Sequence, residues 1–298
     1  CLGARAVVEA HARHAELHRG PTVQTDLEDQ RVPARPGLQG QVATGGAGRE
    51  ETHHTDDGVS CVVCHSITGM GTVHAGGGAN GSIVLGDGAT MHGPIADPSK
   101  TPAHSSKHSP LHTKAELCSN CHTLTHPVNG TIIENTFEEW RKSPYAEAGI
   151  QCQDCHMRTV EQAAETARTM KTIAVPGRTT NGPEERPDVH VHTFIGASVN
   201  RDANLTSEFH AAEAEKRLRS AAKVEVAAPA KAARGAKSKL RVSVTNVAAG
   251  HSIPTSITEL RQVWIDVRVT DADGAEVFRS GAVDAAGRVD PAASMFHS

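Results

Sequence analysis

The chain has 298 residues, with 30 basic and 34 acidic side chains and a formal net charge of -4. This near balance gives no basic surface for a nucleic acid or an anionic membrane, and no apolar run reaches the roughly 20 residues that cross a bilayer. A chain of this length is expected to form about two domains. Aromatic residues make up only 3% of it, which is little material for a large packed core.

The first part of the chain, residues 1–222, is rich in glycine and proline and is expected to be mostly irregular, with a few short helices. We expect irregular backbone over 69–88, where three glycines stand in a row. The spacing of apolar residues predicts short helices over 137–142, 160–170 and 205–222, although their periodicity is weak.

The second part, residues 223–298, has a different texture. After a linker rich in alanine and lysine at 229–238, residues 239–247 and 263–269 alternate between apolar and polar at a period of two, and a turn is expected at 271–274. This pattern predicts a small antiparallel, sandwich-like β domain. Only about four strands fit, which is short for a closed sandwich, so we expect further sequence or a partner to complete the sheet.

One five-residue pattern, C-x-x-C-H, occurs three times in the first part. It is the attachment signature of c-type haem, because two cysteines one helical turn apart can add to the two vinyl groups of one porphyrin while the next residue faces the iron. Zinc and iron-sulfur sites are the alternatives, and a redox dithiol would not need the histidine. The cysteines are Cys61 and Cys64, Cys118 and Cys121, and Cys152 and Cys155, followed by His65, His122 and His156.

We therefore predict three covalently attached haem c groups, each with a proximal histidine on its iron. Their flat apolar faces would replace the missing aromatic side chains. The chain has 19 histidines but only five methionines, which favours bis-histidine haems of low reduction potential. Because c-type haem is attached outside the bacterial cytoplasm, we expect an extracytoplasmic protein in the periplasm or at the cell surface.

Several segments resemble the multihaem c-type cytochromes of bacteria and archaea. In such proteins, segments similar to 192–196 and 246–255 stand before and inside a C-terminal β domain, and a segment similar to 134–145 leads into a haem motif like that at 149–157. The resemblance covers 58–284. It implies an electron-transfer protein whose haems form a chain, with distal histidines drawn from remote segments.

The resemblance also guides the choice of distal ligands. His251 lies in a loop stiffened by Pro254, where the alternative is a surface histidine. His190 and His192 would point to the same side of an extended segment, and His192 is the better match. His104 is chosen for its sequence context in similar proteins. Its competitors are His92, His108, His112, His53 and His54.

Cys1 stands in the frame of a further haem motif, but Ala4 and Arg5 replace the second cysteine and the histidine. Two interpretations stay open. The segment is a degenerate motif from a four-haem ancestor, or Cys1 is the lipid-modified first residue of a mature lipoprotein. No fourth haem is counted in either case.

The expected function is electron transfer within a larger extracytoplasmic assembly, without enzymatic activity. The expected partners are other redox proteins or copies of the chain itself, with no nucleic acid, and with a membrane only through a lipid on Cys1 or a partner complex. The alternative is a redox enzyme of the nitrite reductase or hydroxylamine oxidoreductase type with one open haem, although all three motifs end in histidine and Tyr145 is the only tyrosine. A third interpretation, in which the β domain docks to another subunit, is compatible with the first.

Overall fold

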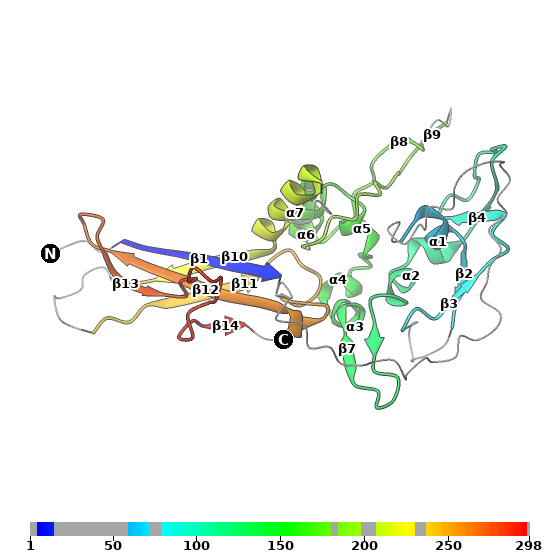
Figure 1. Cartoon of the computed structure of the whole chain (residues 1–298). Helices are drawn as coiled ribbons and strands as arrows, with labels where there is room; N and C mark the ends of the chain where they lie inside the picture. Colours follow the sequence, from blue (N-terminus) through cyan, green and yellow to red (C-terminus); the bar gives the residue numbers. More distant parts are fainter. Residues whose placement is uncertain are drawn as a thin grey trace, which may run out of the picture.

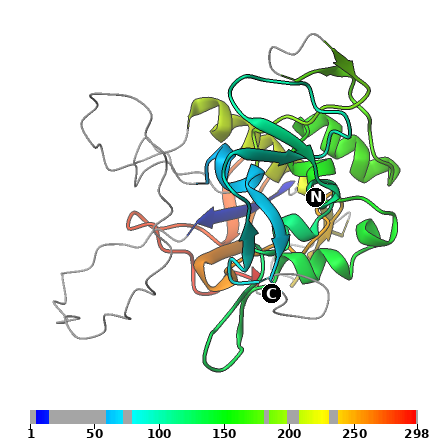
Figure 2. The same cartoon turned by 90° about the vertical axis from the view of Figure 1, so that its right-hand side faces the viewer.

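The computed structural model describes the backbone of residues 5–14 and residues 59–71, 79–179, 184–197, 207–229 and 237–296. Figure 1 shows two parts side by side, an elongated β part and a part built of short helices and small strand pairs. Figure 2 looks at the end that carries α1 and the first strand pairs, with the β part behind it.

Most helices of the first part are short, with only one or two turns. The predicted helices at 137–142, 160–170 and 205–222 correspond to three of them, α3, α6 and α7. The helical elements are α1 (Cys61–His65), η1 (Pro110–Thr113), α2 (Glu116–Ser119), α3 (Thr136–Arg141), α4 (Pro144–Glu147), α5 (Gln153–His156), α6 (Val160–Thr169) and α7 (Glu208–Ala221).

Helix α6 has clear sequence signals at both ends. Thr159 and Gln162 form a reciprocal capping box at its start, each side chain bonding the other's backbone N–H. At its end Met170 adopts a left-handed conformation with φ of 53°. The buried face of α6 packs against α7, and Val160, Ile195 and Ala214 form a small core between them.

Four pairs of short strands complete the first part. The prediction of irregular backbone over 69–88 is wrong at both of its ends, because apolar and β-branched residues flank the glycine run and pair as a hairpin; residues 72–78 lie outside the described ranges. The pairs are β2 (Ile67–Met70) with β3 (Ile83–Leu85), β4 (Thr90–Gly93) with β5 (Ser105–His108), β6 (Leu124–Thr125) with β7 (Ile132–Glu134), and β8 (Gly177–Arg178) with β9 (Glu185–Arg186).

The β part is organised around β12 (Arg261–Thr270). Strand β1 (Arg5–His14) pairs along one edge of β12, and β13 (Glu276–Ser280) and β14 (Met295–Phe296) pair along the other edge. A separate antiparallel pair is formed by β10 (Ala222–Ala227) and β11 (Arg241–Asn246). Trp264 of β12 is 1% exposed, and its indole N–H donates to the carbonyl of Gly281 at 2.9 Å, so it anchors this part.

Strand β1 lies within the predicted first part, 1–222, but its backbone pairs with a strand of the predicted second part, 223–298. Residues 5–14 are in the same sheet as β12, and the predicted division of the chain itself stays a prediction. The long separation in sequence hid the partner strand.

A loop of the β part rests on helices of the first part. The backbone N–H of Ser252 and the hydroxyl of Thr255 both donate to the carboxylate of Glu139, at 3.0 and 2.7 Å. A Cβ atom on Gly250 would lie 3.3 Å from the ring of Tyr145, so the backbone of the loop approaches α4 closely. Among the described residues, no helix combines the length and apolarity that a bilayer span requires.

Candidate haem site

The three C-x-x-C-H motifs each form about one turn of helix. The first makes up α1, the second begins near the end of α2, and the third includes α5. In the second and third motifs the backbone N–H of the histidine donates to the carbonyl of the first cysteine at 2.9 Å. One helical turn therefore brings both thiols and the imidazole of a motif to neighbouring positions.

The motifs also lie close to one another. The thiols of Cys118 and Cys152 lie close enough that Cys118 raises the pKa of Cys152, and the pKa of Cys64 is raised by burial and by the neighbouring Cys118 and Cys121. Burial raises the pKa of Cys155 to about 11. The second motif thus has a cysteine beside a cysteine of each of the other two motifs. All six cysteines of the motifs are free thiols.

Each motif histidine has its Nδ1 atom against a hydrogen-bond acceptor. An imidazole nitrogen that faces a carbonyl or carboxylate oxygen donates its proton to it, which leaves the lone pair of Nε2 available. This is the arrangement typical of histidines that bind metals. The acceptors are the carbonyl of His92 for His65 at 2.6 Å, the carbonyl of Ile195 for His156 at 2.9 Å, and the carboxylate of Glu134 for His122 at 3.0 Å.

His251 lies opposite His156. Their ring centroids are 6.3 Å apart and their planes differ by 13°. The Nδ1 atom of His251 is 3.0 Å from the carbonyl of Ser252, so its Nε2 atom is also left available. Burial, together with the charge of Arg217, lowers the pKa of His156 to about 4, which keeps its imidazole neutral at neutral pH.

His65 has two histidine neighbours. The ring centroid of His192 is 6.2 Å away with planes tilted by 35°, and that of His112 is 5.7 Å away with planes tilted by 16°. The Nε2 atom of His112 lies 3.1 Å from the carbonyl of Cys64, and its Nδ1 atom is buried without a hydrogen-bond partner in the described structure. His192 likewise has a backbone hydrogen bond, with His190, so each of the two imidazoles keeps one nitrogen for a ligand.

These separations suit a metal between two rings. A bond between a metal and an imidazole nitrogen is about 2 Å long, so two imidazoles on opposite sides of one metal have centroids about 6 Å apart. The described residues contain no group of three or more histidine, cysteine or acidic side chains suited to hold a metal ion. Each histidine pair could supply two ligands to one metal.

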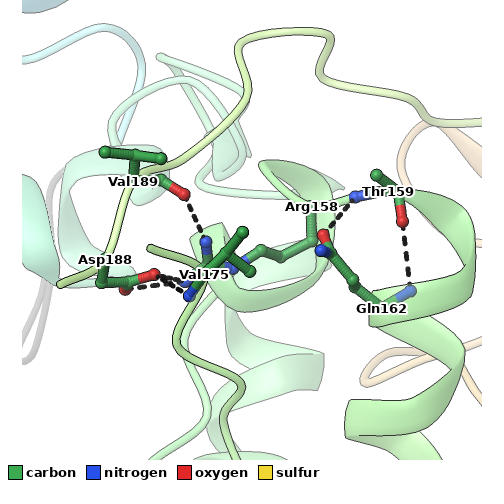
Figure 3. A network of polar contacts seen from close by, with 6 residues as sticks. All are labelled: Arg158, Thr159, Gln162, Val175, Asp188 and Val189. Carbon is green, nitrogen blue, oxygen red and sulfur yellow. Dashed lines mark hydrogen bonds and ion pairs between the residues drawn. The ribbon is translucent and has the colours of Figure 1, made fainter. Parts of the chain in front are cut away.

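A buried arginine holds the segment that carries His192 (Figure 3). The side chain of Arg158 is 2% exposed and donates to both carboxylate oxygens of Asp188, at 2.6 and 2.7 Å, and to the carbonyl of Val189. Asp188 also accepts from the backbone N–H of Val175 at 2.8 Å. Arg158 stands two residues after His156, so it ties the third motif to the segment that approaches the first.

His104 is not brought to a motif histidine within the described structure. It is exposed just before β5, and its Nδ1 atom lies 3.1 Å from the carbonyl of Ser105. Its role as a distal ligand stays a prediction. His53, His54 and Cys1 lie outside the described residues. His92 is buried and its carbonyl, not its ring, contacts His65.

Two contributors to the site, Glu134 and Arg158, were missed by the sequence analysis. Glu134 ends β7 and Arg158 follows the third motif, and neither position belongs to a spacing rule. His112 had been named only as a competitor of His104, and the structure places it beside His65.

Comparison of the chain with protein-family models, with curated proteins and with solved structures gives no match.

Proposed function

We propose that the chain is an electron-transfer protein with three covalently attached haem c groups. The observation that carries the proposal is the pairing of His156 with His251, two imidazoles from distant parts of the chain with a separation that suits an iron atom between them. Bound haem supplies a one-electron couple whose potential is set by its axial ligands and surroundings. The residues that would hold the haems are the six motif cysteines, the proximal His65, His122 and His156, and the distal His192, His251 and His104.

The chain's own contribution is to orient the ligands before an electron arrives. The backbone carbonyls of Ile195 and Ser252 hold the rings of His156 and His251, each through Nδ1. A ring held in this way keeps its tautomer and its direction. Electron transfer then requires little rearrangement of the protein.

The closeness of the motifs supports transfer from one haem to the next. Cys118 and Cys152 are close enough to shift each other's pKa although they belong to different motifs, so porphyrins attached to them would be near neighbours. Cys61 and Cys121 are exposed. A porphyrin on an exposed thiol would have an edge near the surface, where a redox partner or another copy of the chain could approach. We place this assembly outside the cytoplasm, where c-type haem is attached.

The alternative, a redox enzyme with one open haem, is favoured by one observation. The side chain of His122 is 60% exposed, and within the described residues no second imidazole faces it at the separation seen for His65 and His156. The haem of the second motif is therefore where a small ligand such as nitrite or hydroxylamine would bind if this alternative holds.

Electron paramagnetic resonance of the oxidised protein, combined with a pyridine haemochrome assay, separates the two functions. The electron-transfer proposal predicts three haems with low-spin signals and no change on adding nitrite or hydroxylamine. A high-spin haem that binds either ligand would favour the enzyme. Absence of haem from a protein matured in a host competent for haem attachment would contradict both.

A further inference from the structure

Glu134 distinguishes the second motif from the other two. Its carboxylate oxygen Oε1 lies 3.0 Å from the Nδ1 atom of His122. The corresponding acceptors of His65 and His156 are backbone carbonyls, which carry no net charge. One of three otherwise similar imidazoles is thus bonded to a full negative charge.

The carboxylate is held in place from several sides. Glu134 is 8% exposed, and the hydroxyl of Thr136 donates to the same oxygen at 3.3 Å. From the β part, the side chain of Ser256 also hydrogen-bonds to Glu134, and Arg261 adds a positive charge nearby. Thr136 and Thr255 join the two parts beside it, with their hydroxyl oxygens 2.9 Å apart. These partners fix the position of the Glu134 carboxylate beside His122.

We infer that Glu134 is a positioning residue for His122 and gives the haem of Cys118 and Cys121 the lowest reduction potential of the three. This inference rests on the proposed function. A carboxylate that accepts the Nδ1 proton pulls it from the ring, which makes Nε2 a stronger donor to iron. The added negative charge also stabilises the oxidised, more positive iron relative to the reduced one. Both effects lower the potential.

The position of the second motif gives its low potential a consequence for electron transfer. The second motif neighbours both of the others, with Cys118 beside Cys152 and near Cys64. The haem least easily reduced would therefore be the one whose motif neighbours both of the others. Electrons would occupy the other two haems preferentially, and any electron that crosses the haem of the second motif would take a brief uphill step.

The test is a spectroelectrochemical titration of the full chain with its haems attached, comparing the parent with Glu134→Gln. Glutamine keeps the size of the side chain and an oxygen that accepts the Nδ1 proton, but it removes the charge. Glu116→Gln is the matched control, because Glu116 also places a negative charge near Cys118 but has no hydrogen bond to His122 among the described contacts. Glu134→Asp keeps the charge.

The lowest of the three potentials is expected to rise in Glu134→Gln by more than in Glu116→Gln, to stay near the parent value in Glu134→Asp, and to rise without loss of the low-spin signal. Equal shifts in Glu134→Gln and Glu116→Gln, or a shift confined to one of the two higher potentials, would overturn the inference while leaving the proposed function intact. Intact mass is measured on every sample. A parent chain without haem at Cys118 and Cys121 would contradict the proposed function itself.

Discussion

The imidazoles of His156 and His251 face each other across the boundary between the two parts of the molecule, with ring centroids 6.3 Å apart. His156 belongs to a motif turn in the first part, and His251 lies in the loop of the β part that also bonds Glu139. An iron bound by both would crosslink the two parts without a covalent bond between them. The β part would then complete a cofactor site in addition to packing against it.

Replacing His251 should leave haem attachment intact and change one haem. In His251→Ala the two cysteines and His156 remain, so three haems are expected by mass, with one converted to a high-spin or water-ligated state in the electron paramagnetic resonance spectrum. His210→Ala serves as the control, since His210 is an exposed residue of α7 bonded to Ser207. If the spectra of both variants match the parent, His251 is not a ligand.

The two neighbours of His65 can be separated in the same way. His192→Ala should convert a haem to high spin, because His192 is the proposed distal ligand and its ring lies at a suitable separation from His65. In the same proposal His112 packs beside His65 and bonds the carbonyl of Cys64 without binding iron, so His112→Ala should keep the low-spin spectrum. The opposite result, with only His112→Ala changing the spectrum, would make His112 the distal ligand.

The ion pair between Arg158 and Asp188 should contribute measurably to the stability of the folded chain. Arg158→Met removes the arginine donor from the carboxylate of Asp188 and from the carbonyl of Val189. We expect the free energy of unfolding to fall by about 2 kcal/mol, because the arginine is buried but the carboxylate is partly solvated. Denaturant unfolding monitored by haem absorbance measures it. In Arg168→Ala, which breaks an exposed pair with Glu165, a loss below about 0.5 kcal/mol is expected. Similar losses of unfolding free energy in both variants would show that the buried pair stabilises the chain no more than the exposed one.

Gly281 should tolerate no side chain. Its φ is 87°, and a Cβ atom there would overlap the carbonyl oxygen of Ile265 and lie 2.9 Å from the Cα of Asp266. Gly287 has a similar φ of 79° but open space around it. Gly287→Ala is therefore expected to cost only about 1–2 kcal/mol of backbone strain, whereas Gly281→Ala should cost clearly more in thermal unfolding. Equal costs would show that strand β12 can yield at this point.

Local sequence patterns accounted for the local elements of the fold. Each C-x-x-C-H motif forms about one turn of helix, and the capping residues Thr159 and Gln162 start α6. The alternating residues 263–269 lie within β12. These features depend on neighbours in sequence. The partner of β1 and the burial of Glu134 depend on contacts between distant segments, for which one sequence carries no local signal.

In the candidate site, too, the residues set by local spacing could be predicted and those set by long-range contacts could not. The motif cysteines and histidines are recognised by spacing alone, and His192 and His251 were chosen from a resemblance. The structure brings both near motif histidines, while iron binding by either stays a prediction. Glu134 could not have been chosen, because its role comes from the geometry of β7 against the second motif and not from any spacing.

Peptide mass mapping of the matured protein tests the central claim most directly. After proteolysis, the peptides that contain Cys61 and Cys64, Cys118 and Cys121, and Cys152 and Cys155 should each carry the mass of one haem through two thioether bonds. Free or disulfide-bonded thiols in any of the three peptides, or zinc in place of haem in the intact protein, would contradict the account.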